Sequence, residues 1–151
     1  MKFASDVMLG SLARWLRICG IDVFYDAKID RSGLFRIARE EGRTILTKAG
    51  NFKELKEIPP YIMIEGDDLD AQLRQIKKAF PSIDFLSNSF SRCIDCNELL
   101  LEIDKKSAKD EIPPKAYEIA GKFYRCPACK KLFWPGTHVH RMKSRLEQIF
   151  K

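Results

Sequence analysis

The sequence predicts an α/β fold in which a mostly parallel sheet is covered by helices on both faces, followed by a small zinc-binding module. Two observations support this prediction. Short apolar segments alternate with amphipathic helical segments over the first 80 residues, a pattern typical of parallel strands joined by crossover helices. Further along the chain, four of the 5 cysteines form two CxxC pairs. A chain of 151 residues is long enough for one ordinary domain with a compact appendage.

The elements of the first module are predicted from the spacing of apolar residues. Short apolar runs indicate strands, and apolar residues three or four positions apart indicate helices. Gly20 and Gly42 suit the ends of helices, and aspartates suit their beginnings. The expected order is strand 2–5, helix 7–19, strand 22–25, a helix opened by Asp30 or Ser32, strand 44–47, a helical turn around 52–55, strand 61–64, and a helix opened by Asp67 or Asp68.

The boundary between the two modules is expected near residue 91. Residues 1–91 include a Ser-rich linker, which we expect to pack on the first module through Phe85, Leu86 and Phe90. Residues 92–151 are expected to form a zinc ribbon and a basic C-terminal helix. The apolar positions of that helix are Met142, Leu146, Ile149 and Phe150.

Cys93, Cys96, Cys126 and Cys129 are predicted to bind one structural zinc ion. A CxxC turn directs two thiolates to one point, and two such turns complete a tetrahedral site. The 29 residues between the pairs exceed the usual spacing, so we expect a polar loop at 105–115 to interrupt the hairpin. A redox motif and unrelated free thiols are the alternatives, but a redox CxxC usually opens a helix after a strand. A four-thiolate shell has no open position, so this zinc would hold the fold without doing chemistry.

Acidic residues follow several predicted strands. Asp6 follows the first strand, Asp26 the second, and Asp67 and Asp68 the fourth, while Asp30 precedes a helix. Because the C-terminal ends of parallel strands share one edge of a sheet, these carboxylates are expected to converge there. Carboxylates bind Mg²⁺ or Mn²⁺, which can activate water for attack on a phosphodiester. The alternative is that each aspartate only caps a helix.

Positive charge is concentrated near the C-terminus. The whole chain has a net charge of +6, and residues 122–151 hold eight Lys and Arg but one acid, Glu147. Such a field favours a polyanion such as nucleic acid. No apolar run approaches the roughly 18–20 residues of a membrane span, and Asp6 and two arginines interrupt the apolar N-terminus. We therefore expect a soluble, cytoplasmic protein. The fifth cysteine, Cys19, lies on the apolar face of the first predicted helix and is expected in the core.

Four segments give the sequence a family resemblance. They are FASDVMLGSLARWLRICGIDVFYD, EEGRTILTK, SRCIDCN and CPACKKLFWPGTHVHRM. In this order they closely resemble the Mut-seven C-terminal RNase family, described as a PIN-like ribonuclease domain followed by a zinc ribbon. The resemblance implies a PIN-like three-layer α/β/α sandwich, metal-dependent cleavage of RNA, and RNA as the partner. It implies that Asp6 and Asp30 bind catalytic Mg²⁺ or Mn²⁺, and Asp26 and Asp68 are candidates to complete the catalytic site.

The sequence departs from the family pattern at the third strand. That strand usually ends in Thr-Arg-Asp, whose aspartate is an expected metal ligand, whereas this chain has Thr47-Lys48-Ala49. One fewer carboxylate weakens the hold on a hard cation. A second hypothesis is therefore a catalytically weakened PIN-like protein that acts as an RNA-binding or assembly factor. A third is an adaptor for an acidic protein, without any role on nucleic acid.

Basic and aromatic residues are candidates for RNA contact. Cations would bind phosphates, and aromatic rings would stack on bases or else form the core of the ribbon. Arg17 and Arg43 are further candidates for the phosphate path, and the alternative for Arg14 and Arg17 is the solvated face of the first helix. The sequence also allows a homo-oligomer, and it does not determine the oligomeric state. The predicted RNA-binding residues are Arg14, Lys48, Lys130, Lys131, Trp134, His138, Arg141 and Lys143.

Overall fold

The computed structural model describes residues 1–52 and 55–151, and its first module is built on a four-stranded parallel sheet. The strand order is β2-β1-β3-β4. All three pairings are parallel, as the alternation of strands and helices predicted. The strands are β1 (Lys2–Ser5), β2 (Asp22–Phe24), β3 (Thr44–Thr47) and β4 (Tyr61–Met63).

Helices cover both faces of this sheet and form a three-layer sandwich. One core, which includes Phe3, Leu16 and Leu73, lies on the side of α1 and α3. The other core includes Ala4, Leu34 and Ile45 and lies on the side of α2. Successive residues of β1 thus point to opposite faces, as strand geometry requires. The helices are α1 (Gly10–Ile18), which follows the short 3₁₀ helix η1 (Val7–Leu9), α2 (Arg31–Glu41) and α3 (Leu69–Ala79).

The helix boundaries follow from the expected capping residues. The Asp30 carboxylate accepts from the Gly33 N–H at 2.7 Å at the start of α2, and Asp68 caps α3 in the same way. Gly42 ends α2 with a φ of 64°, a conformation that favours glycine. Cys19 is fully buried, and burial raises the pKa of its thiol to about 12, consistent with the predicted core role. The predicted turn around 52–55 includes residues 53–54, which lie outside the described residues.

The second module is a three-stranded antiparallel sheet of order β5-β6-β7. Its strands are β5 (Leu101–Ile103), β6 (Phe123–Arg125) and β7 (Leu132–Phe133). The prediction of a polar loop at 105–115 was wrong, because η3 (Lys105–Glu111) and α4 (Pro114–Ile119) are helical. Ala108, Ile112, Ala120 and Phe123 bury a small core of their own, which gives the helical turns something to pack on.

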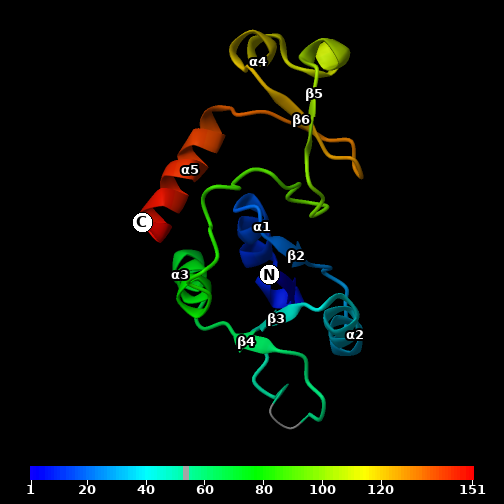
Figure 1. Cartoon of the computed structure of the whole chain (residues 1–151), viewed down its shortest axis with the longest axis vertical. Coiled ribbons are helices and arrows are strands. Elements are labelled where there is room, and N and C mark those ends of the chain that lie inside the picture. The colour runs from blue at the N-terminus through cyan, green and yellow to red at the C-terminus, as the bar shows by residue number, and fades with distance from the viewer. Residues whose placement is uncertain (53–54) are drawn as a thin grey trace.

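The last helix, α5 (Thr137–Phe150), leaves this second module and returns to the first, where it lies beside α3 (Figure 1). Leu146 and Ile149 enter the same core as Leu16 and Leu73. Phe150 stacks on Phe85 of the linker with ring centroids 4.6 Å apart. Phe85, Leu86 and Phe90 pack with the core that contains Leu16 and Leu73, so the linker packs on the first module as expected. The domain boundary at residue 91 stays a prediction. Helix α5 follows the second module in the sequence but contributes Leu146 and Ile149 to the core of the first.

None of the described helices has the length and apolar character needed to cross a membrane.

Candidate functional site

The two CxxC turns have matching backbone geometry. In the first turn the Asn97 N–H donates to the carbonyl of Cys93 at 2.9 Å, and in the second the Lys130 N–H donates to the carbonyl of Cys126 at 3.0 Å. Asn97 and Lys130 both lie in the left-handed region, with φ of 67° and 64°. Each turn is therefore closed by the residue that directly follows its second cysteine.

The four cysteine sulfurs converge on one point. The sulfurs of Cys93, Cys96, Cys126 and Cys129 all lie within 4.8 Å of one another, and those of Cys93 and Cys129 are 3.8 Å apart. A tetrahedral zinc ion with Zn–S bonds of about 2.3 Å requires neighbouring sulfurs about 3.8 Å apart. The donor set and its spacing thus fit a closed, structural zinc site.

The thiols strongly influence one another's ionisation. The hydrogen bond with Cys129, followed by burial, raises the pKa of Cys96 to about 12. Burial also opposes ionisation of Cys126, but backbone N–H groups of the second turn outweigh it and lower the pKa of Cys126 to about 7. The free thiols therefore share only part of the negative charge of four thiolates, whereas a divalent cation allows all of them to ionise.

Arg17, a buried residue of α1, joins the first module to the first CxxC turn. Its Nη1 donates to the carbonyls of Ile94 at 2.8 Å and Asp95 at 3.1 Å, the two residues inside that turn. Its Nε donates to the carbonyl of Val23 in β2 at 3.0 Å. Burial lowers the pKa of Arg17, and the neighbouring Cys93 and Asp95 partly offset this effect.

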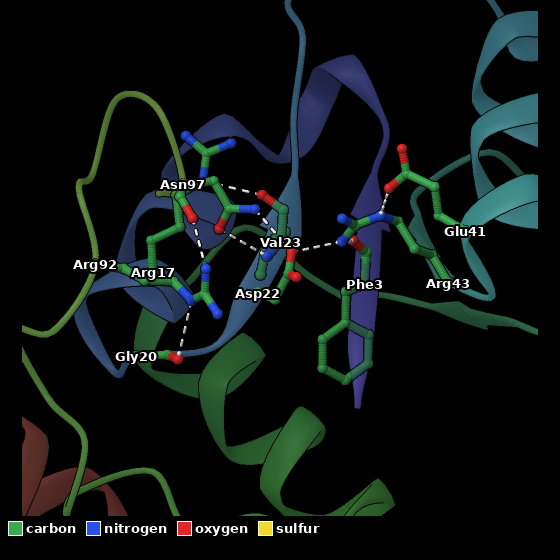
Figure 2. A network of polar contacts seen from close by, with 9 residues as sticks. All are labelled: Phe3, Arg17, Gly20, Asp22, Val23, Glu41, Arg43, Arg92 and Asn97. Atoms are coloured by element: carbon green, nitrogen blue, oxygen red, sulfur yellow. Dashed lines mark hydrogen bonds and ion pairs between the residues drawn. The ribbon is translucent and has the colours of Figure 1, made fainter. Parts of the chain in front are cut away.

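Asn97 completes the connection on the same strand (Figure 2). Its Oδ1 accepts from the Val23 N–H at 3.0 Å, and its Nδ2 donates to Asp22 Oδ1 at 2.7 Å. Arg43 Nη1 donates to that same Asp22 oxygen at 2.6 Å and to the carbonyl of Phe3 at 3.0 Å. Burial tends to raise the pKa of Asp22, but hydrogen bonds from Arg43 and Asn97 outweigh it and hold the pKa below its ordinary value. We call Arg17, Asp22, Arg43 and Asn97 the interface network.

The interface network corrects one expectation. The predicted place of Arg17 and Arg43 on the phosphate path is wrong, because they are only 4% and 8% exposed and donate to protein carbonyls and carboxylates. The spacing of apolar residues does not reveal these partners, because contacts such as that of Arg17 with Ile94 span 77 positions. Asn97 did carry a usable signal, since a residue after a CxxC turn often needs a left-handed φ, which Asn tolerates.

Asp6 is fixed at the C-terminal edge of the parallel sheet. Its Oδ2 accepts from the hydroxyl of Thr47 at 2.7 Å and from the Lys48 N–H at 2.8 Å, and its Oδ1 accepts from the Met8 N–H at 2.9 Å. A carboxylate offers about four lone-pair directions. Three are used by these donors, so about one is left for a further partner.

The residues that follow β3 lie next to Asp6 at this edge of the sheet. Lys48 forms an ion pair with Asp67, which follows β4. Ala49, at the position where the family pattern expects an acid, is half-buried and packs on the core formed with α2. Asn51 Oδ1 accepts from Arg31 Nη2 at 2.6 Å, so this amide is bonded to α2.

The other predicted catalytic acids are exposed and make local hydrogen bonds. Asp30 and Asp68 cap α2 and α3, and Asp26 accepts from the Lys28 N–H at 2.9 Å. Over residues 1–52 and 55–151, only the four cysteines form a group of three or more His, Cys, Asp or Glu side chains close enough to hold a cation. Mg²⁺ is often held by one or two carboxylates together with substrate phosphates, so a three-acid cage is not required.

Half of the predicted RNA-binding residues lie together. They line a cleft of about 920 Å³ between α1, the ribbon and α5. These residues are Arg14, Trp134, His138 and Lys143.

The other predicted RNA-binding residues lie outside that cleft. Lys48 is at the sheet edge, and Lys130 closes the second CxxC turn. Lys131 donates to Asp95 at 2.8 Å, across the two CxxC turns, so part of its charge is neutralised. Arg141 is exposed on α5.

Comparison with known proteins identifies one family. The family model described as the Mut7-C RNAse domain matches residues 1–146, nearly the whole chain. No curated protein matches the chain, and no solved structure does.

Proposed function

Because the chain belongs to the Mut7-C RNase domain family, we propose that it is a ribonuclease that cleaves phosphodiester bonds at the C-terminal edge of its parallel sheet. The observation that supports this location most strongly is the orientation of Asp6. Neighbouring backbone and hydroxyl donors hold both of its oxygens, yet about one lone pair remains free. A carboxylate held in this way is preorganised for a ligand or a proton.

We propose Asp6 and Asp30 as the residues that would hold Mg²⁺ or Mn²⁺, with Asp26 and Asp68 as further acids at the site. A bound cation of this kind would stabilise charge on the phosphate and activate water. Asp6 contributes a fixed carboxylate, because Thr47 is fully buried and its hydroxyl cannot turn to solvent. The remaining acids are exposed and would approach a substrate phosphate only when it binds.

Lys48 has a separate part in this proposal. Its backbone N–H donates to Asp6 and orients that carboxylate. Its ammonium group forms an ion pair with Asp67 at the same edge of the sheet. A substrate phosphate that reaches the edge would compete with Asp67 for this ammonium group, since Asp67 is almost fully exposed. We propose that Lys48 binds phosphate, and that the ribbon and α5 bind the rest of the RNA.

The experiment that tests this function is a cleavage assay on fluorescently labelled RNA with Mn²⁺ or Mg²⁺ or with neither. Zinc-loaded wild type is compared with Asp6→Asn and with Asp110→Asn, which makes the same change on the exposed surface of η3. Loss of a positioned carboxylate should lower the rate by roughly 100-fold or more. Asp110→Asn should cleave at the wild-type rate. Equal rates for all three proteins would reject Asp6 as a catalytic residue.

A second candidate function rests on Ala49. With a methyl group where the family pattern has an acid, the edge has one carboxylate fewer for a hard cation. In this alternative the chain acts as an RNA-binding or assembly factor, and its turnover of RNA is weak or absent. RNA affinity would then fall steeply with salt, as phosphate contacts require. The two candidates differ in whether zinc-loaded wild type cleaves RNA at all.

A further inference from the structure

The cleft between the two modules has walls of unusual composition. One wall is α1, with Ser11, Arg14 and Trp15, and the opposite walls are the ribbon strands and the start of α5. Its volume of about 920 Å³ is at the upper end of small-ligand pockets. Five of its lining residues are aromatic: Trp15, Phe90, Tyr124, Phe133 and Trp134.

The charge of the lining is entirely of one sign. Arg14, Arg92 and Lys143 line the cleft together with His138 and His140, and among the described residues no Asp or Glu lines it. Arg92 is committed to the carbonyls of Gly20 and Asn97, whereas Lys143 is exposed. Arg14 Nη2 lies 3.9 Å from Asp95 Oδ1, but both side chains are exposed, so a phosphate can compete for this guanidinium. A surface that combines aromatic rings with exposed cations is complementary to a polyanion whose monomers carry flat rings.

Phe90 and Trp134 each pack on a core and keep part of the side chain exposed. Trp134 is half-buried and follows β7, with its ring tilted against Phe123 at a centroid distance of 5.9 Å. Phe90 is also half-buried and has a φ of 65°, a conformation rarely adopted by a bulky residue. Its N–H donates to the carbonyl of Ile18 at 2.7 Å, which holds this strained residue against the end of α1. Strain of this kind is commonly maintained at binding sites.

The start of α1 connects the cleft to the C-terminal edge of the parallel sheet, where Asp6 lies. Asp6 caps η1, and η1 continues directly into α1, whose first turn places Ser11 in the cleft wall. The nine residues of α1 extend about 13 Å from this point to the CxxC turn. A chain lying along α1 would therefore pass from the zinc-stabilised ribbon to the edge where Asp6 lies.

We propose that this cleft binds a single-stranded segment of the RNA substrate, with bases stacked on Phe90 and Trp134 and phosphates bound by Arg14 and Lys143. This inference rests on the proposed ribonuclease function and adds the form of the substrate: RNA with an unpaired segment next to the cleaved bond. A-form duplex is excluded from such stacking, because its bases face one another and it presents only backbone and groove edges.

Binding without added Mg²⁺ or Mn²⁺ tests the inference separately from cleavage. The probes are a fluorescein-labelled 12-nucleotide oligouridylate and a blunt RNA duplex of the same length, followed by anisotropy. The single strand should bind more tightly than the duplex. Trp134→Ala should weaken single-strand binding roughly 10-fold, the effect of losing one stacked base.

A matched pair of charge variants keeps the test decisive even if Trp134→Ala disturbs the ribbon. Lys143→Glu changes an exposed cleft residue on α5, and Lys115→Glu makes the same change on exposed α4, outside the cleft. Only Lys143→Glu should weaken binding, by roughly 5-fold to 10-fold at low salt. Equal effects of the two variants, or equal affinity for strand and duplex, would overturn the inference.

The same proteins separate the two proposals. One outcome is cleavage that depends on Asp6 and yet is unaffected by Trp134→Ala and Lys143→Glu. This result would support the proposed ribonuclease function and reject the proposal that the cleft binds single-stranded RNA. Single-strand binding that depends on the cleft, without cleavage under any metal condition, would sustain the cleft and reject the ribonuclease.

Discussion

The side-chain amide of Asn97 donates to Asp22 Oδ1 at 2.7 Å, so the residue that closes the first CxxC turn is bonded to the first residue of an edge strand of the parallel sheet. Its carbonyl oxygen also accepts from the Val23 N–H. Arg17 Nε donates to the Val23 carbonyl, so the side chains of Asn97 and Arg17 together supply hydrogen bonds that a further strand would otherwise make with β2. The first CxxC turn thus lies against this edge of the sheet, so a metal held by the four cysteines would be linked to the first module.

Substitution of Asn97 should uncouple the two modules without straining the turn. Asn97→Gly keeps a residue that accepts a φ of 67° but removes both amide bonds. We expect a loss of about 1–3 kcal/mol in the free energy of unfolding, measured by urea denaturation. Hydrogen exchange should show faster exchange of the Val23 amide. Unchanged exchange there would contradict the capping role.

Zinc removal should affect β2 as well as the ribbon. A Cys96→Ser variant loses one of four ligands, and binding energy at such a site is folding energy. Amides of β5 to β7 should lose protection from hydrogen exchange, and Val23 should lose it with them. The amides of α2 serve as the internal control, since α2 lies on the other face of the sheet. Retained protection at Val23 would show that the interface forms without metal.

The Asp22–Arg43 ion pair should make stability depend on pH. Because the folded-state pKa of Asp22 is depressed, its contribution is complete above the unfolded value of about 4 and is lost as pH falls through the folded value. At pH 7 the Asp22→Asn variant should be less stable than wild type by about 2 kcal/mol. This difference should shrink towards pH 3, and comparing the two proteins cancels the groups they share. A difference independent of pH would refute the charge pairing.

Thr47 offers a test of how Asp6 is oriented. Thr47→Val removes the hydroxyl that donates to Asp6 at 2.7 Å and preserves the shape of a fully buried side chain. We expect a roughly 10-fold lower cleavage rate, with little change in RNA affinity, because a misoriented group loses catalytic efficiency. Thr44→Val, in the same strand but at its other end, is the control. Equal rates for both variants would show that the hydroxyl has no positioning role.

Much of the fold was predictable because local rules determine it. Strands 2–5 and 44–47, the Asp30 cap and the Gly42 stop follow from hydrophobic period and capping chemistry. Paired CxxC spacing was sufficient to predict that the four cysteines come together as a possible metal site. Two features were not accessible. The helices between 105 and 119 depend on a small core that forms only with Phe123, and the interface network depends on contacts more than 70 residues apart.

The candidate site was only partly predictable for the same reason. That Asp6 follows β1 is visible in the sequence, but two of its three donors come from the end of β3, 41 and 42 residues away. The grouping of Arg14 with Trp134 and Lys143 requires α5 to return to the first module. The positive charge of residues 122–151 indicates in the sequence that a polyanion is favoured. The position of the cleft, in contrast, depends on tertiary packing.

We propose that the sheet edge cleaves RNA although Ala49 stands where the family pattern has an acid. The most direct measurement compares the time course of cleavage of a single-stranded RNA by zinc-loaded wild type and by Ala49→Asp, each with Mn²⁺ and with chelator. We predict that wild type cleaves with Mn²⁺ and that the added carboxylate changes the rate without creating the activity. Cleavage that appears only in Ala49→Asp would contradict this claim and identify the natural chain as an RNA-binding protein.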